Sequence, residues 1–141
     1  MPTNNATVCH LSFHVSDLGV SRRFYIDLLG CGEGRSAPTW VDIDFFGHQV
    51  SLHEGTPITP AYTGDVDGVA VPMPHFGAVL PLKTWQQVAA RLEAANIEFV
   101  IAPHVRYEGQ SGEQHTMFFL DPSGNAIELK SMNRQDELFH S

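Results

Sequence analysis

The sequence predicts the same succession of structural elements twice, and this repeat constrains the fold more than any other feature. Strands with alternating polar and apolar residues begin near His10 and near His75, which are 65 residues apart. After each strand comes an amphipathic helix, at residues 17–29 and at residues 84–95, and three shorter strands follow each helix. Because one such unit could not bury its sheet alone, we predict two βαβββ modules in one α+β domain.

Composition places the module boundaries. We expect a single domain over residues 1–141, with a first module at residues 8–55 and a second at residues 75–132. Residues 56–74 are rich in Thr, Gly and Pro and show no sustained periodicity, which predicts a linker. Residues 133–141 are predicted to form a polar tail.

Charge and segment composition exclude several classes of protein. Eight Lys and Arg residues oppose sixteen Asp and Glu residues, and the net charge of -8 disfavours nucleic acid and anionic membranes as partners. No apolar stretch is long enough to span a bilayer, and residues 1–8 do not resemble a signal peptide, so we expect a cytoplasmic protein. Cys9 and Cys31 are predicted to be free thiols that pack in the core.

Residues 117–130 predict a hairpin with an acidic residue inside its second strand. The sequence DPSG at residues 121–124 is typical of a tight turn, so the apolar stretches beside it should pair as antiparallel strands. Glu128 shares one strand face with Ala126 and Lys130. A carboxylate on an enclosed sheet face is costly unless it is paired, hydrogen-bonded or bound to a metal, so Glu128 needs a partner from elsewhere in the chain.

Alignment of the two modules identifies three candidate metal ligands. His10 and His75 occupy equivalent positions near the start of their modules. The residue four positions after the glycine of the last turn is Ser51 in the first module and Glu128 in the second. Two imidazoles and one carboxylate suit a divalent transition metal and leave adjacent coordination positions open, as in non-haem Fe(II) oxygenases. We therefore predict a metal site formed by His10, His75 and Glu128.

These residues resemble the motifs of the vicinal oxygen chelate superfamily, which includes glyoxalases, extradiol ring-cleaving dioxygenases, fosfomycin-resistance thiol transferases and bleomycin-binding proteins. The similar motifs are HLSF at residues 10–13, HFG at residues 75–77 and FLDPSGNAIE at residues 119–128. The resemblance implies a curved eight-stranded mixed sheet around a metal cavity, a small-molecule substrate, and metal ligation by His10, His75 and Glu128.

Departures from the family patterns favour one activity over the others. Glyoxalases of this family fill all four equivalent positions with metal ligands, whereas Ser51 is a poor ligand. Extradiol dioxygenases use the same two His and one Glu, and they carry an acid–base histidine where His53 lies. The resemblance therefore favours a dioxygenase-like oxidoreductase with Fe(II) or Mn(II), with Zn(II) and Ni(II) as alternatives. Phe118 departs from this pattern, because the dioxygenase signature has a tyrosine at that position.

Three further side chains are candidates for catalysis. His53 is the candidate general acid or base, since a neutral imidazole can accept a proton near neutral pH. Residues 107–115 extend the second module beyond the first and are read as a solvated loop or as a lid over a pocket. Tyr107 and His115 are candidates to supply hydrogen-bonding groups from this segment.

Two other functions stay open. A non-redox metal enzyme, either a glyoxalase-like lyase or isomerase or a thiol transferase, would use the same three ligands. A small-molecule-binding resistance protein would perform no chemistry, but such members generally lack the metal ligands. The resemblance also allows a homodimer, and the sequence leaves open whether the two modules close around the metal within one chain or across a dimer.

Overall fold

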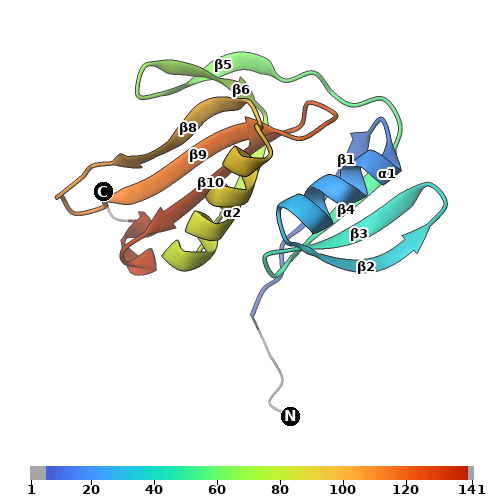
Figure 1. The fold of residues 1–141 in the computed structure, drawn as a ribbon, viewed down its shortest axis with the longest axis horizontal. Coiled ribbons are helices and arrows are strands. Elements are labelled where there is room, and N and C mark those ends of the chain that lie inside the picture. The colour runs from blue at the N-terminus through green and yellow to red at the C-terminus, as the bar shows by residue number, and fades with distance from the viewer. Residues whose placement is uncertain (1–5, 140–141) are drawn as a thin grey trace, which may run out of the picture.

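Both predicted modules are present in the computed structural model, which describes residues 6–139 (Figure 1). The first module consists of β1 (His10–Val15), α1 (Leu18–Arg22), its π-helical continuation η1 (Arg23–Leu28), β2 (Gly32–Ala37), β3 (Trp40–Phe45) and β4 (His48–Glu54). The second consists of β7 (His75–Val79), α2 (Leu82–Ala94), β8 (Phe99–Arg106), β9 (Gln114–Leu120) and β10 (Ala126–Met132). Both sheets have the same strand order, β1-β4-β3-β2 and β7-β10-β9-β8, with the first and last strands of each module parallel. The α+β class is therefore confirmed.

The strands of the two modules form two separate four-stranded sheets instead of the single eight-stranded sheet that the resemblance implied. The sheets come close to each other at β1 and β7, where the rings of Phe13 and Phe76 have centroids 5.2 Å apart. The side chains of Phe13 and Phe76 thus bridge these two strands. In the described part of the chain, side-chain packing therefore joins the sheets where the expected sheet would have had backbone hydrogen bonds.

Residues 56–74 contain a hairpin that the linker prediction missed. Strand β5 (Ala61–Val66) pairs with β6 (Val69–Met73) across a turn at Asp67 and Gly68, whose φ angles are 51° and 81°. An Asp-Gly pair between strands is typical of a type I′ turn, so the sequence carried this signal. Val71 of the hairpin is buried against Ala126, and the hairpin therefore covers part of the second sheet.

Local sequence predicts the start of α1 correctly but not that of α2. Asp17 caps α1 as predicted, because its Oδ1 accepts a hydrogen bond from the N–H of Val20 at 2.9 Å. The predicted start of α2 at Thr84 is wrong, since the helix begins at Leu82 with Pro81 at the N-cap and no side-chain cap. Leu82 packs against the core, and this tertiary contact extends the helix beyond its local capping signal.

One hydrophobic core lies between the two modules. It combines apolar residues from both sheets and from the helical segments of both modules, including Val15, Phe24, Ile43, Leu52, Val88, Met117, Ile127 and Leu129. Arg91 of α2 donates hydrogen bonds to the carbonyl oxygens of Leu28 and Leu29 at 2.7 and 3.0 Å. The hydroxyl of Tyr25 donates to Asp121 at 2.8 Å. The helix sides of the modules therefore pack together, and each sheet turns its other face away from this core.

The termini and cysteines complete the fold. The predicted polar tail contains a short 3₁₀ helix, η2 (Gln135–Phe139), while residues 140 and 141, like residues 1–5, lie outside the described part. No helix within residues 6–139 is both long and apolar enough to cross a membrane. Both cysteines are free, and burial raises the pKa of Cys31 to about 12. Cys9 is exposed because it precedes β1, so its predicted place in the core is wrong.

Candidate metal centre

His75 and Glu128 come together on the outer face of the second sheet. They lie on the parallel neighbours β7 and β10, where His75 is opposite Ala126 and Glu128 is opposite Gly77. His75 Nε2 is 3.7 Å from Glu128 Oε1. Glu128 is only 8% exposed, and its other oxygen, Oε2, accepts a hydrogen bond from the Thr116 hydroxyl at 3.0 Å. One oxygen of Glu128 is therefore hydrogen-bonded, and the other faces the His75 imidazole.

The surroundings of His75 leave its Nε2 free to bind a metal. His75 Nδ1 lies 2.9 Å from the carbonyl oxygen of Pro72. Because a carbonyl only accepts hydrogen bonds, Nδ1 carries a proton, and in the neutral imidazole Nε2 therefore keeps its lone pair. Two ligand atoms that are each about 2.0 to 2.2 Å from one ion lie about 2.8 to 3.6 Å apart at octahedral or tetrahedral angles. The 3.7 Å between His75 Nε2 and Glu128 Oε1 is just above this range, so a small movement of either side chain would place both atoms on a single divalent metal.

Gly77 allows β7 to approach β10 at the level of this pair. A Cβ atom at residue 77 would clash with the backbone carbonyl oxygen of Glu128. Since Gly77 and Glu128 are opposite each other in the strand register, a larger residue would force the two strands apart. The glycine of the HFG motif is therefore a steric requirement for the position of His75 beside Glu128.

His10 is on the outer face of the first sheet, where it is exposed. Its Nδ1 lies 2.8 Å from Gln49 Oε1, and its Nε2 lies 3.2 Å from the Ser12 hydroxyl. Ser51 is only 5% exposed and donates a hydrogen bond to Asp42 Oδ1 at 2.5 Å. Asp42 was not among the residues predicted from the sequence, although the antiparallel pairing of β3 with β4 places it opposite Ser51.

One chain does not bring the three predicted ligands together. Among residues 6–139, no group of three His, Cys, Asp or Glu side chains is close enough to hold a metal ion. The shared core explains this, because each sheet buries one face in it and carries its predicted ligands on the other. We call these surfaces the His10 face, formed by His10, Ser12, Asp42, Gln49 and Ser51, and the Glu128 face, formed by His75, Thr116, Phe118, Glu128 and Lys130.

His53 is on the same side of the first sheet as His10 but far along the strands. In the register of β1 and β4, His10 is opposite Gln49, and His53 is opposite His14, four residues further on. Four strand residues span about 13 Å, so neither His14 nor His53 is next to a metal held by His10. The His53 ring stacks on Trp40 with a centroid distance of 6.3 Å. His53 could therefore reach only a distal part of a bound substrate.

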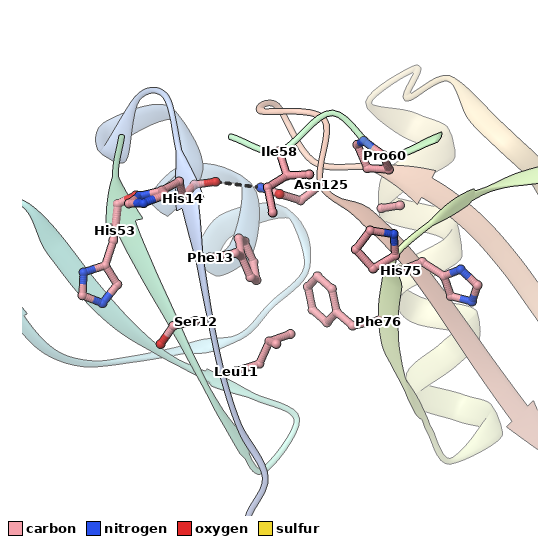
Figure 2. A pocket seen from close by; sticks show the side chains of 12 residues that line it. Leu11, Ser12, Phe13, His14, His53, Ile58, Pro60, His75, Phe76 and Asn125 are labelled. Atoms are coloured by element: carbon pink, nitrogen blue, oxygen red, sulfur yellow. Dashed lines mark hydrogen bonds between the residues drawn. The ribbon is translucent and has the colours of Figure 1, made fainter. Parts of the chain in front are cut away.

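A cavity of about 550 Å³ lies at the seam between the two sheets. Figure 2 shows Phe13 and Phe76 side by side in this cavity, while the imidazoles of His53 and His75 point to opposite sides of it. Most of its lining is apolar and includes Leu11, Phe13, Ile58, Pro60 and Phe76. The cavity therefore separates the two ligand-bearing sides of the chain.

The candidates from residues 107–115 are divided between the two sides of the second sheet. The ring of His115 lies 5.3 Å from Trp85 of α2, so His115 is on the helix side of the sheet. Glu128 is on the other side of the sheet. The structure therefore does not bring His115 to the predicted site. Tyr107 accepts a hydrogen bond from Arg106 at 3.0 Å and lines a small cavity with Lys130. Tyr107 is thus at the margin of the Glu128 face.

These paired βαβββ modules are those of the vicinal oxygen chelate fold. A family model described as the Glyoxalase/Bleomycin resistance protein/Dioxygenase superfamily matches residues 7–129, and the chain belongs to this superfamily. Its members generally bind divalent metals and small molecules and often form dimers. No curated protein sequence matches the chain.

Solved structures from two bacteria are similar over almost the whole chain. One is a glyoxalase/bleomycin resistance protein/dioxygenase from Alicyclobacillus acidocaldarius, with 28% identity, a TM-score of 0.74, and coverage of 96% of this chain and 98% of that chain. The other is the fosfomycin resistance protein FosX from Listeria monocytogenes, with 17% identity, a TM-score of 0.69, and coverage of 94% and 97%. At this level of identity the second similarity concerns the fold alone.

Proposed function

We propose that the protein is a divalent-metal-dependent enzyme that acts on a small substrate with two adjacent oxygen atoms, with dioxygenase-like chemistry as the leading candidate. The observation that carries this proposal is the His75–Glu128 pair, whose Nε2 and Oε1 atoms are 3.7 Å apart. The free lone pair of His75 and the 8% exposure of Glu128 support metal binding, because a buried carboxylate needs strong compensating partners.

In this proposal His10 completes the ligand set from a second copy of the chain. The His10 face and the Glu128 face are both on the side of their sheet away from the shared core. In a twofold dimer, the His10 face of one chain would lie over the Glu128 face of the other, and symmetry would produce two identical sites. Leu11 and Ile58, which line the seam cavity, are 40% and 68% exposed, and this apolar surface supports an interface between two copies.

The residues around the pair would have separate roles in this centre. The metal, when bound, supplies Lewis acidity and adjacent positions for two substrate oxygens. Thr116 orients Glu128 through its hydrogen bond, and Lys130 Nζ, 3.9 Å from Glu128 Oε1, places a positive charge beside it. Phe118 is fully buried and contacts the His75 ring edge-on at 4.8 Å, which keeps water from that side of the imidazole.

The leading reaction follows from the number of ligands. The Ser51 hydroxyl donates a hydrogen bond to Asp42 and is poorly placed to act as a fourth ligand. Three protein ligands leave several metal positions open, which suits Fe(II) or Mn(II) with a vicinal oxygen substrate and O2. His53 remains the candidate acid or base for a distal substrate proton, and Tyr107 a candidate hydrogen-bonding group at the margin of the site.

A non-redox reaction, such as an addition or an isomerisation, is the second candidate. Phe118 favours it, because this residue packs against His75 at the position where dioxygenases have a tyrosine. A phenyl ring offers no hydrogen bond to an oxygen atom of a bound substrate. Mn(II), Zn(II) or Ni(II) would serve such a reaction, since none of its steps needs a change of metal oxidation state.

Anaerobic loading with Fe(II), Mn(II), Zn(II) or Ni(II) separates these candidates. Elemental analysis should find about one metal ion per chain, as expected for one three-ligand site per protomer. Oxygen consumption with a panel of catechols in the Fe(II) protein would support dioxygenase chemistry. Turnover that is indifferent to oxygen would support the non-redox reaction. A protein that retains no metal and has the same stability with and without chelator would contradict both and indicate a binding function.

A further inference from the structure

A continuous set of hydrogen bonds crosses three strands of the His10 face. His10 Nδ1 on β1 is 2.8 Å from Gln49 Oε1 on β4. Gln49 Nε2 donates to Asp42 Oδ2 on β3 at 3.2 Å. The other oxygen of Asp42 accepts from the Ser51 hydroxyl at 2.5 Å. His10 and Asp42 are thus connected through the side-chain amide of Gln49.

The carboxylate of Asp42 determines the direction of every bond in this set. A carboxylate only accepts, so the amide nitrogen of Gln49 must face Asp42 and the amide oxygen must face His10. The amide oxygen also only accepts, so the proton of the neutral imidazole is on Nδ1. Nε2 of His10 then keeps its lone pair and accepts from the Ser12 hydroxyl at 3.2 Å. The reverse orientation of Gln49 would place two acceptors against each other.

The second module selects the same histidine tautomer with a backbone group. Nδ1 of His75 faces the carbonyl oxygen of Pro72 at 2.9 Å, and this acceptor is part of the main chain. In the neutral form of both histidines, Nε2 is therefore the nitrogen that carries no proton. In the first module the tautomer of His10 depends on side chains, so single substitutions can change it.

We propose that Asp42 is a positioning residue of the metal centre, which holds His10 in the tautomer with Nε2 free by orienting Gln49. This inference rests on the proposed function, because it concerns one of the three ligands of that centre. Asp42 lies beside Ser51, which occupies the first-module position equivalent to Glu128. In this proposal Asp42 does not bind the ion but orients His10 through Gln49. Partners of this kind that orient a ligand typically change metal affinity by about 10- to 100-fold.

The central test is Asp42→Asn, which keeps the shape of the side chain and adds a donor. The asparagine can present either its oxygen or its nitrogen to Gln49, so the orientation of Gln49 is no longer fixed and His10 should populate both tautomers. Nitrogen-15 shifts of the metal-free protein at a pH of about 8.5, where ordinary imidazoles are neutral, report the tautomer directly. The spectrum of His10→Gln assigns the signals. The Kd for Mn(II) should increase by about 10- to 100-fold.

Asp44→Asn is the matched control, because Asp44 is on the same strand and the same face as Asp42. Its Oδ1 accepts from the N–H of Gly47 at 2.8 Å, and an asparagine oxygen can still accept this bond. The control removes one negative charge from the same surface but does not alter the partner of Gln49. Its tautomer signals and its Kd should equal those of the unmodified protein.

The double variant Asp42→Asn with Gln49→Glu provides a rescue. A carboxylate at residue 49 would accept from Nδ1 of His10 and also from the amide nitrogen of Asn at residue 42. Both the tautomer and the Mn(II) affinity should then return toward the original values. The double variant also keeps the test decisive if the single variant is unstable in thermal unfolding, because it restores a donor–acceptor match.

Two outcomes would overturn the inference: an Asp42→Asn protein with the same tautomer and Kd as the Asp44→Asn control, or a double variant as weak as the single one. Failure of the proposed function would look different. A protein whose metal content is unchanged by His10→Gln would refute the ligand assignment, while the tautomer change in metal-free Asp42→Asn would still establish the action of Asp42 on His10.

Discussion

The two modules have the same strand order but hold their histidines in different ways. His75 is beside a buried carboxylate, and a backbone carbonyl sets its tautomer. His10 is exposed, and its tautomer depends on Gln49 and Asp42. Backbone contacts are insensitive to most substitutions, whereas side-chain contacts are not. The Glu128 face is therefore the preorganised half of the proposed metal site, and the His10 face is the adaptable half.

The largest effect is expected from Glu128→Ala, because it removes the one carboxylate among the three proposed ligands. Its loss of Mn(II) affinity should exceed the roughly 10- to 100-fold change that is typical when only a supporting hydrogen bond is lost. His10→Ala should cost less, since the His75–Glu128 pair remains. Isothermal titration measures both values, with the exposed Glu93 changed to Ala as the control. Equal losses of Mn(II) affinity in the two ligand variants would contradict the proposal that the Glu128 face is the preorganised half of the site.

Mixing two defective chains tests whether the halves come from different copies. His10→Ala and Glu128→Ala proteins, unfolded together and refolded, should form mixed dimers in which one of the two sites has all three ligands. Statistical mixing restores about a quarter of the sites, as metal content or activity. A mixture of His75→Ala and Glu128→Ala should restore none, because both changes are in the same half. If the first mixture also restores none, the site does not form across a dimer.

A smaller effect on Mn(II) affinity is expected from removing the hydroxyl group of Thr116 or of Ser51. Thr116→Val removes the hydrogen bond to Glu128 Oε2 and should weaken Mn(II) binding by about 10-fold. Ser51→Ala should change the Kd by less than this, because Ser51 contacts Asp42 and no proposed ligand directly. Titration of both variants under identical conditions provides the comparison. A greater loss in Ser51→Ala would indicate that Ser51 itself binds the metal.

The smallest effect concerns the helices that follow β1 and β7. Asp17→Ala removes the side-chain cap of α1 and should lower the free energy of unfolding by about 1 kcal/mol. Thr84→Ala should change it much less, since α2 begins at Leu82 without a side-chain cap. Denaturant unfolding measures both values. A similar loss in both variants would show that Thr84 caps α2 in solution.

Local sequence patterns predicted most of each module. The alternation around Glu128 placed Ile127 and Leu129 in the core, and the DPSG turn closes with the N–H of Gly124 donating to the carbonyl of Asp121 at 3.0 Å. Alternation along β9 likewise places His115 on the face opposite to Phe118, the residue paired with Glu128, so the sequence pattern already argues against this candidate. The partner of Ser51 was less accessible, because finding Asp42 needs the register between β3 and β4.

The sequence by itself determined the repeat and the side of each strand on which the candidate ligands lie, because both depend on periodicity within a few residues. Only the tertiary structure decided how the ligand-bearing faces of the two sheets are oriented relative to each other. Apolar residues from both modules bury one another in a single core, and this long-range packing turns the His10 face and the Glu128 face outward. Contacts such as that between Arg91 and Leu28 join residues 63 positions apart, and no local pattern encodes such contacts.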